Sequence, residues 1–313
     1  MALTEDWQRQ LRETLAEADL EHLADVCLRF AQPAWAIIPI PVPPTGATRL
    51  GGSPDLPPSV EWPTDPDGAR GNFFGQLDLA SLPSEAGFGR SGLLGLFTTH
   101  LESAAEPVVV DAVLTPAGSP LEPVEASEVD DDYADPDTGY LTAVGVRFDQ
   151  IISLPLTQKD FIAAVRACTD NADDLYTLVE LFEERTGGSI GQLGGFGNPH
   201  SDDDFRRVLY FHRHGHPNAQ WCDHFHSREE YLASVTPAQR ADPRRHGEEF
   251  DWIFDTADAI ASEAARWRLL LRIDSNHAMR LNLMDWDPIY FYAPADEIES
   301  GRIEHVEAMV TQG

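Results

Sequence analysis

Leu50-Gly51-Gly52-Ser53-Pro54, followed by Phe73-Phe74-Gly75-Gln76-Leu77-Asp78 and Gly92-Leu93-Leu94-Gly95-Leu96-Phe97, is the part of the sequence that decides the fold. A glycine pair before a proline is typical of a tight turn, and short apolar runs bounded by turn residues are typical of buried strands. This stretch therefore predicts two neighbouring strands entered through a glycine turn.

A looser copy of the same pattern occurs later, as Leu193-Gly194-Gly195, Leu269 to Asp274 and Ile289 to Tyr292. Asp78 and Asp274 are 196 residues apart, as are Leu93 and Ile289, whereas the two Leu-Gly-Gly motifs are 143 apart. A duplication then requires 53 additional residues between the glycines and the strand of the second copy. The alternative is chance, since short apolar runs ending in Asp recur without common origin.

The composition describes a globular chain with an extreme acidic surplus. The 313 residues are 42% hydrophobic and carry a net charge of −31. Such a charge argues against nucleic acid or an anionic membrane as partner and suits a basic protein partner. Lys159 is the only lysine, so a Walker phosphate loop is excluded. With three scattered cysteines and no apolar signal segment, we expect a cytoplasmic protein.

The pattern of elements predicts an α+β fold with a β-rich core, peripheral helices and an N-terminal amphipathic helix over residues 4–30. Residues 32–68 are rich in Pro and Gly and predict extended irregular chain. Further strands are expected at 72–79, 92–98, 107–114, 142–154, 206–213, 267–274, 279–284 and 288–293. Further helices are expected from 157, and at 171–186, 228–241, 247–266 and 295–300. The organisation that follows is an N-terminal helix (1–31) and one domain (32–313), with halves 48–155 and 187–306 and an inserted segment at about 200–252.

The order of these motifs resembles the YwqG-like family, a bacterial domain of unknown function. The matching segments, which lie within residues 48–306, are Leu50 to Pro54, Trp62-Pro63, Phe73 to Asp78, Gly92 to Phe97, Leu193 to Pro199, Trp267 to Ser275, Asp285-Trp286-Asp287 and Ile289 to Ile298. Arg272 stands where the family usually has a second Gln, and Pro288 where a Gly is expected. The resemblance implies an α+β fold and no established activity. Its relatives resemble proteins found near polymorphic toxin systems, which implies an immunity or binding role by analogy.

A histidine-rich segment at 212–226 is the first candidate site. If residues 206–213 form a strand, alternating histidines share one face, which is a geometry that chelates a transition metal. The residues that would hold zinc are His212, His214, His216, Cys222, His224 and His226. The competing interpretation is a polar loop that happens to be rich in His, because the spacing matches no standard zinc finger.

A cleft between the two halves is the second candidate. Asp78 and Asp274 end equivalent strands and would serve as paired carboxylates in a shared cleft, lined by Gln76, Arg272 and Trp286. The alternative is that each Asp caps a turn at the end of its strand.

These observations lead to two functional hypotheses. The first is a non-enzymatic binding protein of immunity type, with no catalytic residues, whose acidic surface engages a basic protein partner. The second is a metal-dependent hydrolase that uses the histidine-rich segment, with zinc as cofactor. Neither nucleic acid nor a membrane is an expected partner.

Overall fold

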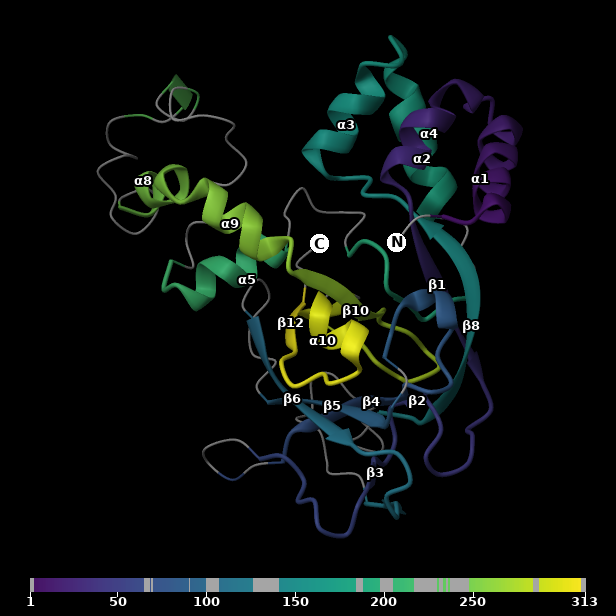
Figure 1. The fold of residues 1–313 in the computed structure, drawn as a ribbon, viewed down its shortest axis with the longest axis vertical. Coiled ribbons are helices and arrows are strands. Elements are labelled where there is room, and N and C mark those ends of the chain that lie inside the picture. Colours follow the sequence, from purple (N-terminus) through teal and green to yellow (C-terminus); the bar gives the residue numbers. More distant parts are fainter. Residues whose placement is uncertain are drawn as a thin grey trace.

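The computed structural model (Figure 1) describes residues 3–64, 68, 70–89, 91–99, 107–125, 141–183, 188–197, 205–216, 230, 233–234, 236, 248–283 and 287–310. Its strands are β1 (Gln32–Ile40), β2 (Arg49–Leu50), β3 (Asp55–Leu56), β4 (Asn72–Asp78), β5 (Leu93–Thr99), β6 (Pro107–Thr115), β7 (Glu122–Pro123), β8 (Val144–Ser153), β9 (Gly191–Leu193), β10 (Trp267–Ile273), β11 (Ile289–Pro294) and β12 (Glu307–Val310). Its helices are α1 (Glu5–Glu17), α2 (Ala24–Phe30), α3 (Lys159–Arg166), α4 (Ala172–Glu183), α5 (Phe205–Arg213), α8 (Glu248–Asp255), α9 (Ala257–Ala264) and α10 (Ala295–Ser300), with 3-10 turns η1 (Glu21–Leu23) and η2 (Ser84–Ala86).

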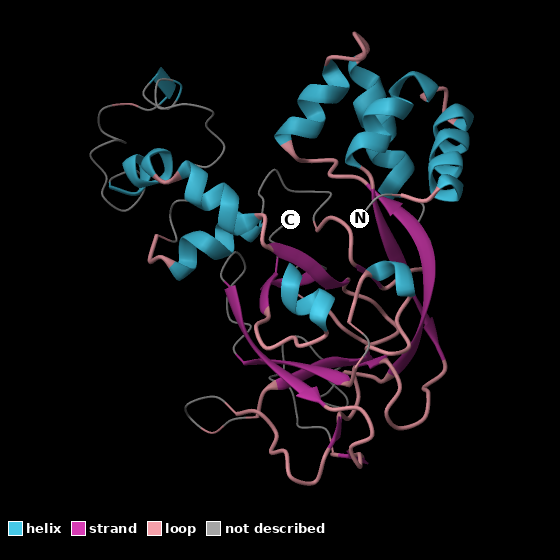
Figure 2. Cartoon of the chain, in the orientation of Figure 1, coloured by secondary structure: helices cyan, strands magenta, loops and turns pink. Residues whose placement is uncertain are grey.

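Within the described residues, ten strands close into a barrel in the order β1-β8-β2-β4-β5-β6-β12-β11-β10-β9, and β9 pairs back onto β1. Every neighbouring pair in this ring is antiparallel. Strands β3 and β7 form a separate two-stranded sheet. The expected β-rich core with peripheral helices is therefore a closed antiparallel barrel with helices around it (Figure 2).

Apolar side chains fill the barrel interior. The rings of Phe74 on β4 and Phe291 on β11 lie 5.9 Å apart, although these two strands are not neighbours in the ring, so they meet across the interior. Leu50, Leu94 and Leu271 are fully buried in the same cluster. Such close packing of large side chains leaves the barrel as a solid core.

The helices gather at one end of the barrel (Figure 1). Helix α2 leads into the start of β1 and α3 follows the end of β8, and Gln32 pairs with Ser153 at that end. Likewise α9 leads into β10 and α10 follows β11, where Trp267 pairs with Pro294. The opposite end is made of connecting loops.

The N-terminal segment contains two helices where one was expected. Helix α1 buries Trp7, Leu11 and Leu15 and begins at Thr4, whose hydroxyl accepts a hydrogen bond from the Trp7 N–H. The chain then turns at Asp19, which has a φ of +59°, a left-handed conformation that ends a helix. One continuous helix over 4–30 was therefore wrong in extent.

Three further predictions were wrong. Residues 206–213 are not a strand, because α5 occupies Phe205–Arg213 and buries Phe205, Val208 and Leu209 at helical spacing. Residues 32–40, within the stretch expected to be irregular, form β1. The predicted strand 279–284 is reduced to one bridge, at Leu281, among its described residues. The predicted helix 228–241 falls almost entirely outside the described residues.

The ring of strands has a mirrored order. Read from β8 it runs β8-β2-β4-β5-β6, and read backwards from β1 it runs β1-β9-β10-β11-β12. Each sequence contains a bulge at the corresponding place, at Phe74 in β4 and at Leu270 in β10. These two bulges are 196 residues apart, which is also the separation of Asp78 from Asp274 and of Leu93 from Ile289.

Candidate functional site

A buried polar network lies beside β2 and β4. The Arg49 guanidinium donates to Oδ2 of Asp55 at 2.7 Å, and its other terminal nitrogen donates to the Ser53 carbonyl. The same Oδ2 accepts hydrogen bonds from the Gly46 N–H and from the Gln76 amide, each at 2.7 Å. Arg49 and Asp55 expose 7% and 0% of their side chains, so this is a fully buried ion pair.

This network sets the ionisation of Asp55. Burial raises the pKa of the carboxyl, but the hydrogen bonds from Arg49, Gly46 and Gln76 together with the Arg49 charge lower the pKa further, and the net pKa is below its usual value. Asp55 is therefore a carboxylate at neutral pH, held by donors on three sides. Such a pair fixes the course of the glycine turn between β2 and β3.

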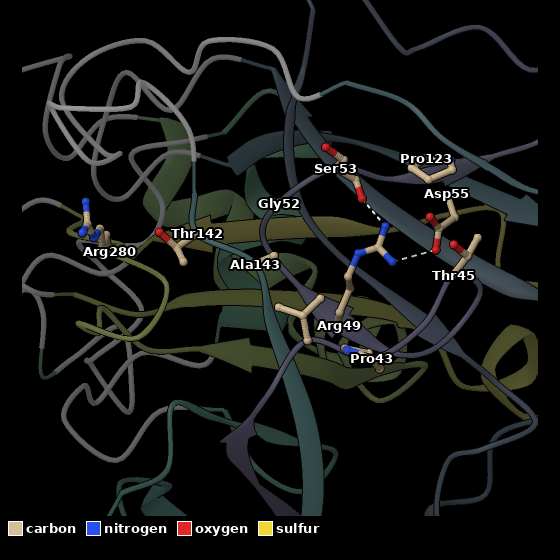
Figure 3. Close-up of a pocket in the computed structure, with 11 residues that line it drawn as sticks. Pro43, Thr45, Arg49, Gly52, Ser53, Asp55, Pro123, Thr142, Ala143 and Arg280 are labelled. Carbon is tan, nitrogen blue, oxygen red and sulfur yellow. Dashed lines mark hydrogen bonds and ion pairs between the residues drawn. The ribbon is translucent and has the colours of Figure 1, made fainter.

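Arg49 and Asp55 also form one wall of a pocket of about 500 Å³ at the loop end of the barrel (Figure 3). We call it the Arg49 pocket. Its lining residues are Val42, Pro43, Thr45, Arg49, Gly52, Ser53, Asp55, Pro123, Thr142, Ala143 and Arg280. Most belong to the segments around β2 and β8, whereas Arg280 comes from the connection between β10 and β11. The volume is within the range of small-molecule sites.

The predicted cleft residues of the first half have structural roles. Gln76 is buried, and besides its contact with Asp55 it donates to the Ala47 carbonyl. Asp78 ends β4, and its Oδ1 accepts a hydrogen bond from the Ala80 N–H at 3.1 Å. That geometry is the turn cap that the alternative interpretation expected.

In the second half, Arg272 and Asp274 form an ion pair with each other, with Nε 2.8 Å from Oδ1. Strands β4 and β10 run in opposite directions in the alternating ring. No hydrogen bond or ion pair within the described residues joins Asp78 to Asp274, and the paired-carboxylate cleft stays a prediction. Trp286 lies outside the described residues.

The histidine-rich segment begins on a helix, which changes its geometry. His212 lies in the last turn of α5, and the ring of His214 packs on Tyr210 with centroids 4.2 Å apart. His216 stacks on Trp252 at 4.0 Å. Because residues two apart on a helix do not share a face, the strand-based argument for convergence no longer applies.

Cys222, His224 and His226 lie outside the described residues. Within the described part of the chain, no three His, Cys, Asp or Glu side chains are placed so that they could hold a metal ion together. The zinc site of the hydrolase hypothesis remains a prediction. None of the described helices has both the length and the apolar composition needed to cross a bilayer.

Sequence reasoning identified Gln76 but missed Arg49, Asp55 and the Arg49 pocket. The available signal was a basic and an acidic residue six positions apart across the turn at Gly51-Gly52, a spacing that brings their side chains together. Arg280 gave no local signal, since it reaches the pocket only through the barrel topology.

Comparison with models of protein families shows which family this chain belongs to. Residues 48–309 match the model of a domain of unknown function, DUF1963, which covers β2 through most of β12. Comparison with curated proteins gives no match. The chain therefore belongs to the DUF1963 family.

Proposed function

We propose that this DUF1963 protein is a YwqG-like, non-enzymatic binding protein whose acidic surface engages a basic protein partner in the cytoplasm, in an immunity-type role. The observation that carries the proposal is the charge, 53 acidic against 22 basic residues. A surface with this surplus attracts a cationic partner over several ångströms and speeds its association.

The described arginines support this proposal, because many are already neutralised within the chain. Arg9 pairs with Asp6, Arg147 with Asp149 and others with their own nearby carboxylates. Arg213 bridges Glu263 and Glu307, at 3.5 and 3.4 Å. These described arginines are therefore engaged within the chain, and the acidic surplus of 53 against 22 is left to act on a partner.

The helical end offers a place for the partner. We call helices α1–α4 and their connections the acidic cap. Its exposed carboxylates include Glu5, Asp6, Glu13, Glu17, Asp19, Glu21, Asp25, Asp160, Asp170, Asp173 and Glu180. Charge reversal on this cap should weaken a basic partner more than the same change elsewhere.

The test is affinity capture from lysate at low salt, followed by titration of the captured protein against the full chain at rising ionic strength. We expect a basic partner whose affinity falls steeply with salt and falls further when Glu17 and Glu21 become Lys. The control is Glu122→Lys, an exposed site on β7 away from the cap. A partner whose affinity changes neither with salt concentration nor with the substitutions in the acidic cap would refute the proposal.

We also infer that the barrel arose from two related halves. Arg49 on β2 pairs with Gln76 on β4, and Gln192 on β9 pairs with Arg272 on β10. Both pairs consist of one Arg and one Gln, but the Arg is on the first strand of one pair and on the second strand of the other. The bulges at equivalent positions and the mirrored strand order support the same conclusion.

The glycine turns extend this relation. A side chain on Gly52, at φ +74°, would come within 2.5 Å of Ala143 Cβ, and one on Gly195, at φ +76°, within 2.8 Å of Ala34 Cβ. Equivalent glycines thus face equivalent alanines. Gly52→Ala and Gly195→Ala should therefore destabilise the barrel by similar amounts in chemical denaturation, and widely different losses would count against related halves.

A further inference from the structure

Strand β6 lies between β5 and β12 in the ring, and its edge toward β12 is mostly unpaired (Figure 1). On one side β5 pairs with β6 all the way from Val109 to Thr115. On the other side the described part of β12 pairs only with Pro107 and Val108. From Val110 to Leu114, β6 makes no backbone hydrogen bond to any described segment other than β5. Such an edge presents N–H and C=O groups with which another strand can pair.

The burial of the side chains agrees with an edge that meets water. On β5, every residue from Leu93 to Thr98 is buried. On β6, Val109 is 60% exposed, and the residues from Val110 to Leu114 are only half-buried. Some of these half-buried side chains pack against the barrel core, so water reaches the rim of the core along this strand.

The segment before β12 is held away from β6 by helix α10. If the register of β6 and β12 continued, His305 would lie opposite Asp111. Instead, Oε2 of Glu297 on α10 accepts hydrogen bonds from the N–H groups of Glu304 and His305, at 2.8 and 2.9 Å. These N–H groups are therefore committed to Glu297, and this part of the chain does not complete the edge of β6.

The side chains of β6 favour a basic strand at this edge. Asp111 lies midway along it, on the same face as Val109 and Val113, because alternate residues of a strand share a face. Asp111 makes no hydrogen bond or ion pair with a described residue. A Lys or Arg on a neighbouring strand would form a favourable cross-strand pair with it. Two β6 edges from two copies would instead bring like carboxylates together in chains of net charge −31.

We propose that β6 accepts an extended basic segment of a partner protein, which adds a strand beside Val110 to Leu114 and sets a Lys or Arg against Asp111. Main-chain hydrogen bonds supply the affinity in this mode of recognition, and the alternating side chains supply the specificity. The edge is a different surface from the acidic cap. Capture of a protein that depends on the cap and binding of a strand to β6 can therefore fail independently.

The test is a calorimetric titration of the full chain with an octapeptide of alternating Val and Lys, capped at both ends. Two analogues are the controls: one has Glu in place of Lys, and the other keeps the Lys but has every backbone nitrogen methylated. We expect saturable binding of the Lys peptide and slower hydrogen exchange of the β6 amides when it is bound. The methylated analogue has the same charge but no backbone donors, so it should bind roughly tenfold or more weakly. Equal binding of the two Lys peptides would reduce the effect to general electrostatic attraction and overturn the proposal.

A charge substitution tests the position of the added strand. Asp111→Lys should weaken the Lys peptide by roughly fivefold, the size of one cross-strand charge pair, and should strengthen the Glu peptide. The matched control is Asp258→Lys, which makes the same change of net charge at an exposed position of α9 and should bind as the wild type does. The proposal fails if the Lys peptide does not saturate, if exchange in β6 does not slow, or if Asp111→Lys behaves like Asp258→Lys. A wild-type chain that sediments as a dimer with β6 already protected would assign the edge to a second copy and overturn it as well.

Discussion

The buried pair of Arg49 and Asp55 gives the sharpest prediction about stability. Asp55→Asn keeps the shape of the side chain but leaves the Arg49 guanidinium, only 7% exposed, without its counter-charge. Removing one partner of a buried pair costs about 3–5 kcal/mol, because the remaining charge stays desolvated. An unfolding entropy of about 2.1 cal/mol/K per residue gives roughly 0.66 kcal/mol/K for this chain, so we expect the melting temperature to fall by about 5–8 °C.

The assay is a double-mutant cycle in urea at neutral pH with Asp55→Asn, Arg49→Gln and the double variant. Because the double variant removes both charges, its loss should be smaller than the sum of the single losses by about 1.5 kcal/mol or more. The matched control is Asp149→Asn in the exposed pair with Arg147, where we expect a change within about 0.5 kcal/mol. Additive losses in the cycle would refute the reasoning.

The pair also predicts a pH dependence. The folded pKa of Asp55 is lowered, so its contribution to stability is present above the unfolded pKa of about 3.9 and is lost as the pH falls through the folded pKa. Asp55→Asn should therefore flatten the acid limb of the stability curve relative to the wild type. An unchanged acid limb would show that the ionisation of Asp55 is not coupled to folding.

Three other predictions concern separate parts of the chain. Gly195→Ala should lower the free energy of unfolding more than Gly194→Ala in chemical denaturation. A Cβ at Gly195 would lie under 3.0 Å from the Cβ atoms of neighbouring residues, whereas a Cβ at Gly194 has its nearest neighbour at 4.0 Å. Equal losses of stability would contradict this. A hydrogen bond from a threonine, and after it one with His22, lowers the pKa of Asp174 in the folded protein. The contribution of Asp174 to folding stability is therefore present above its unfolded pKa and is lost as the pH falls through the folded pKa. Asp174→Asn should remove this loss of protection at acid pH in hydrogen exchange of α4, and an unaltered exchange profile would refute it. If the hydrolase hypothesis holds, elemental mass spectrometry of chelator-free protein should find about one zinc per chain, lost on alanine substitution of the histidines in 212–226, and metal-free protein would retire it.

The sequence predicted the barrel strands best where apolar runs were long and ended at turn residues. β4 and β10 begin at or next to the predicted positions, because their buried alternation is carried by the chain itself. β1 escaped prediction because Pro33 and Pro39 suggested irregular structure. Strand β1 tolerates them since β9 pairs with it only at Trp35 and Ala36, which leaves much of one edge without ladder hydrogen bonds among the described residues.

Helix α5 shows the limit of periodicity in a short segment. The run from Val208 to Phe211 is continuously apolar, which suits a buried strand and a buried helix equally. The structure places Val208 and Leu209 against β10 and β11, and Phe211 against α8 and α9, so burial on two sides explains the run. Only tertiary contacts could decide between the two.

The candidate site depended even more on topology. Asp78 and Asp274 end similar stretches of sequence, and this similarity led us to predict that the two carboxylates line one cleft. The strands that carry them, β4 and β10, instead run in opposite directions around the ring, and no described contact joins the two carboxylates. Arg49 and Arg280, which look unrelated in sequence, line one pocket for the same reason.

The way the ring closes has a consequence for synthesis. Among the described residues β6 meets β12 through two register pairs, Val108 with Ala308 and Pro107 with Met309, which are about two hundred residues apart in the chain. While the ribosome is still making the residues between them, β6 has no β12 to pair with and its edge is open to other strands. Closure has to wait until residue 310 has emerged, so the barrel should fold slowly and late, and nascent chains should depend on chaperones that shield strand edges.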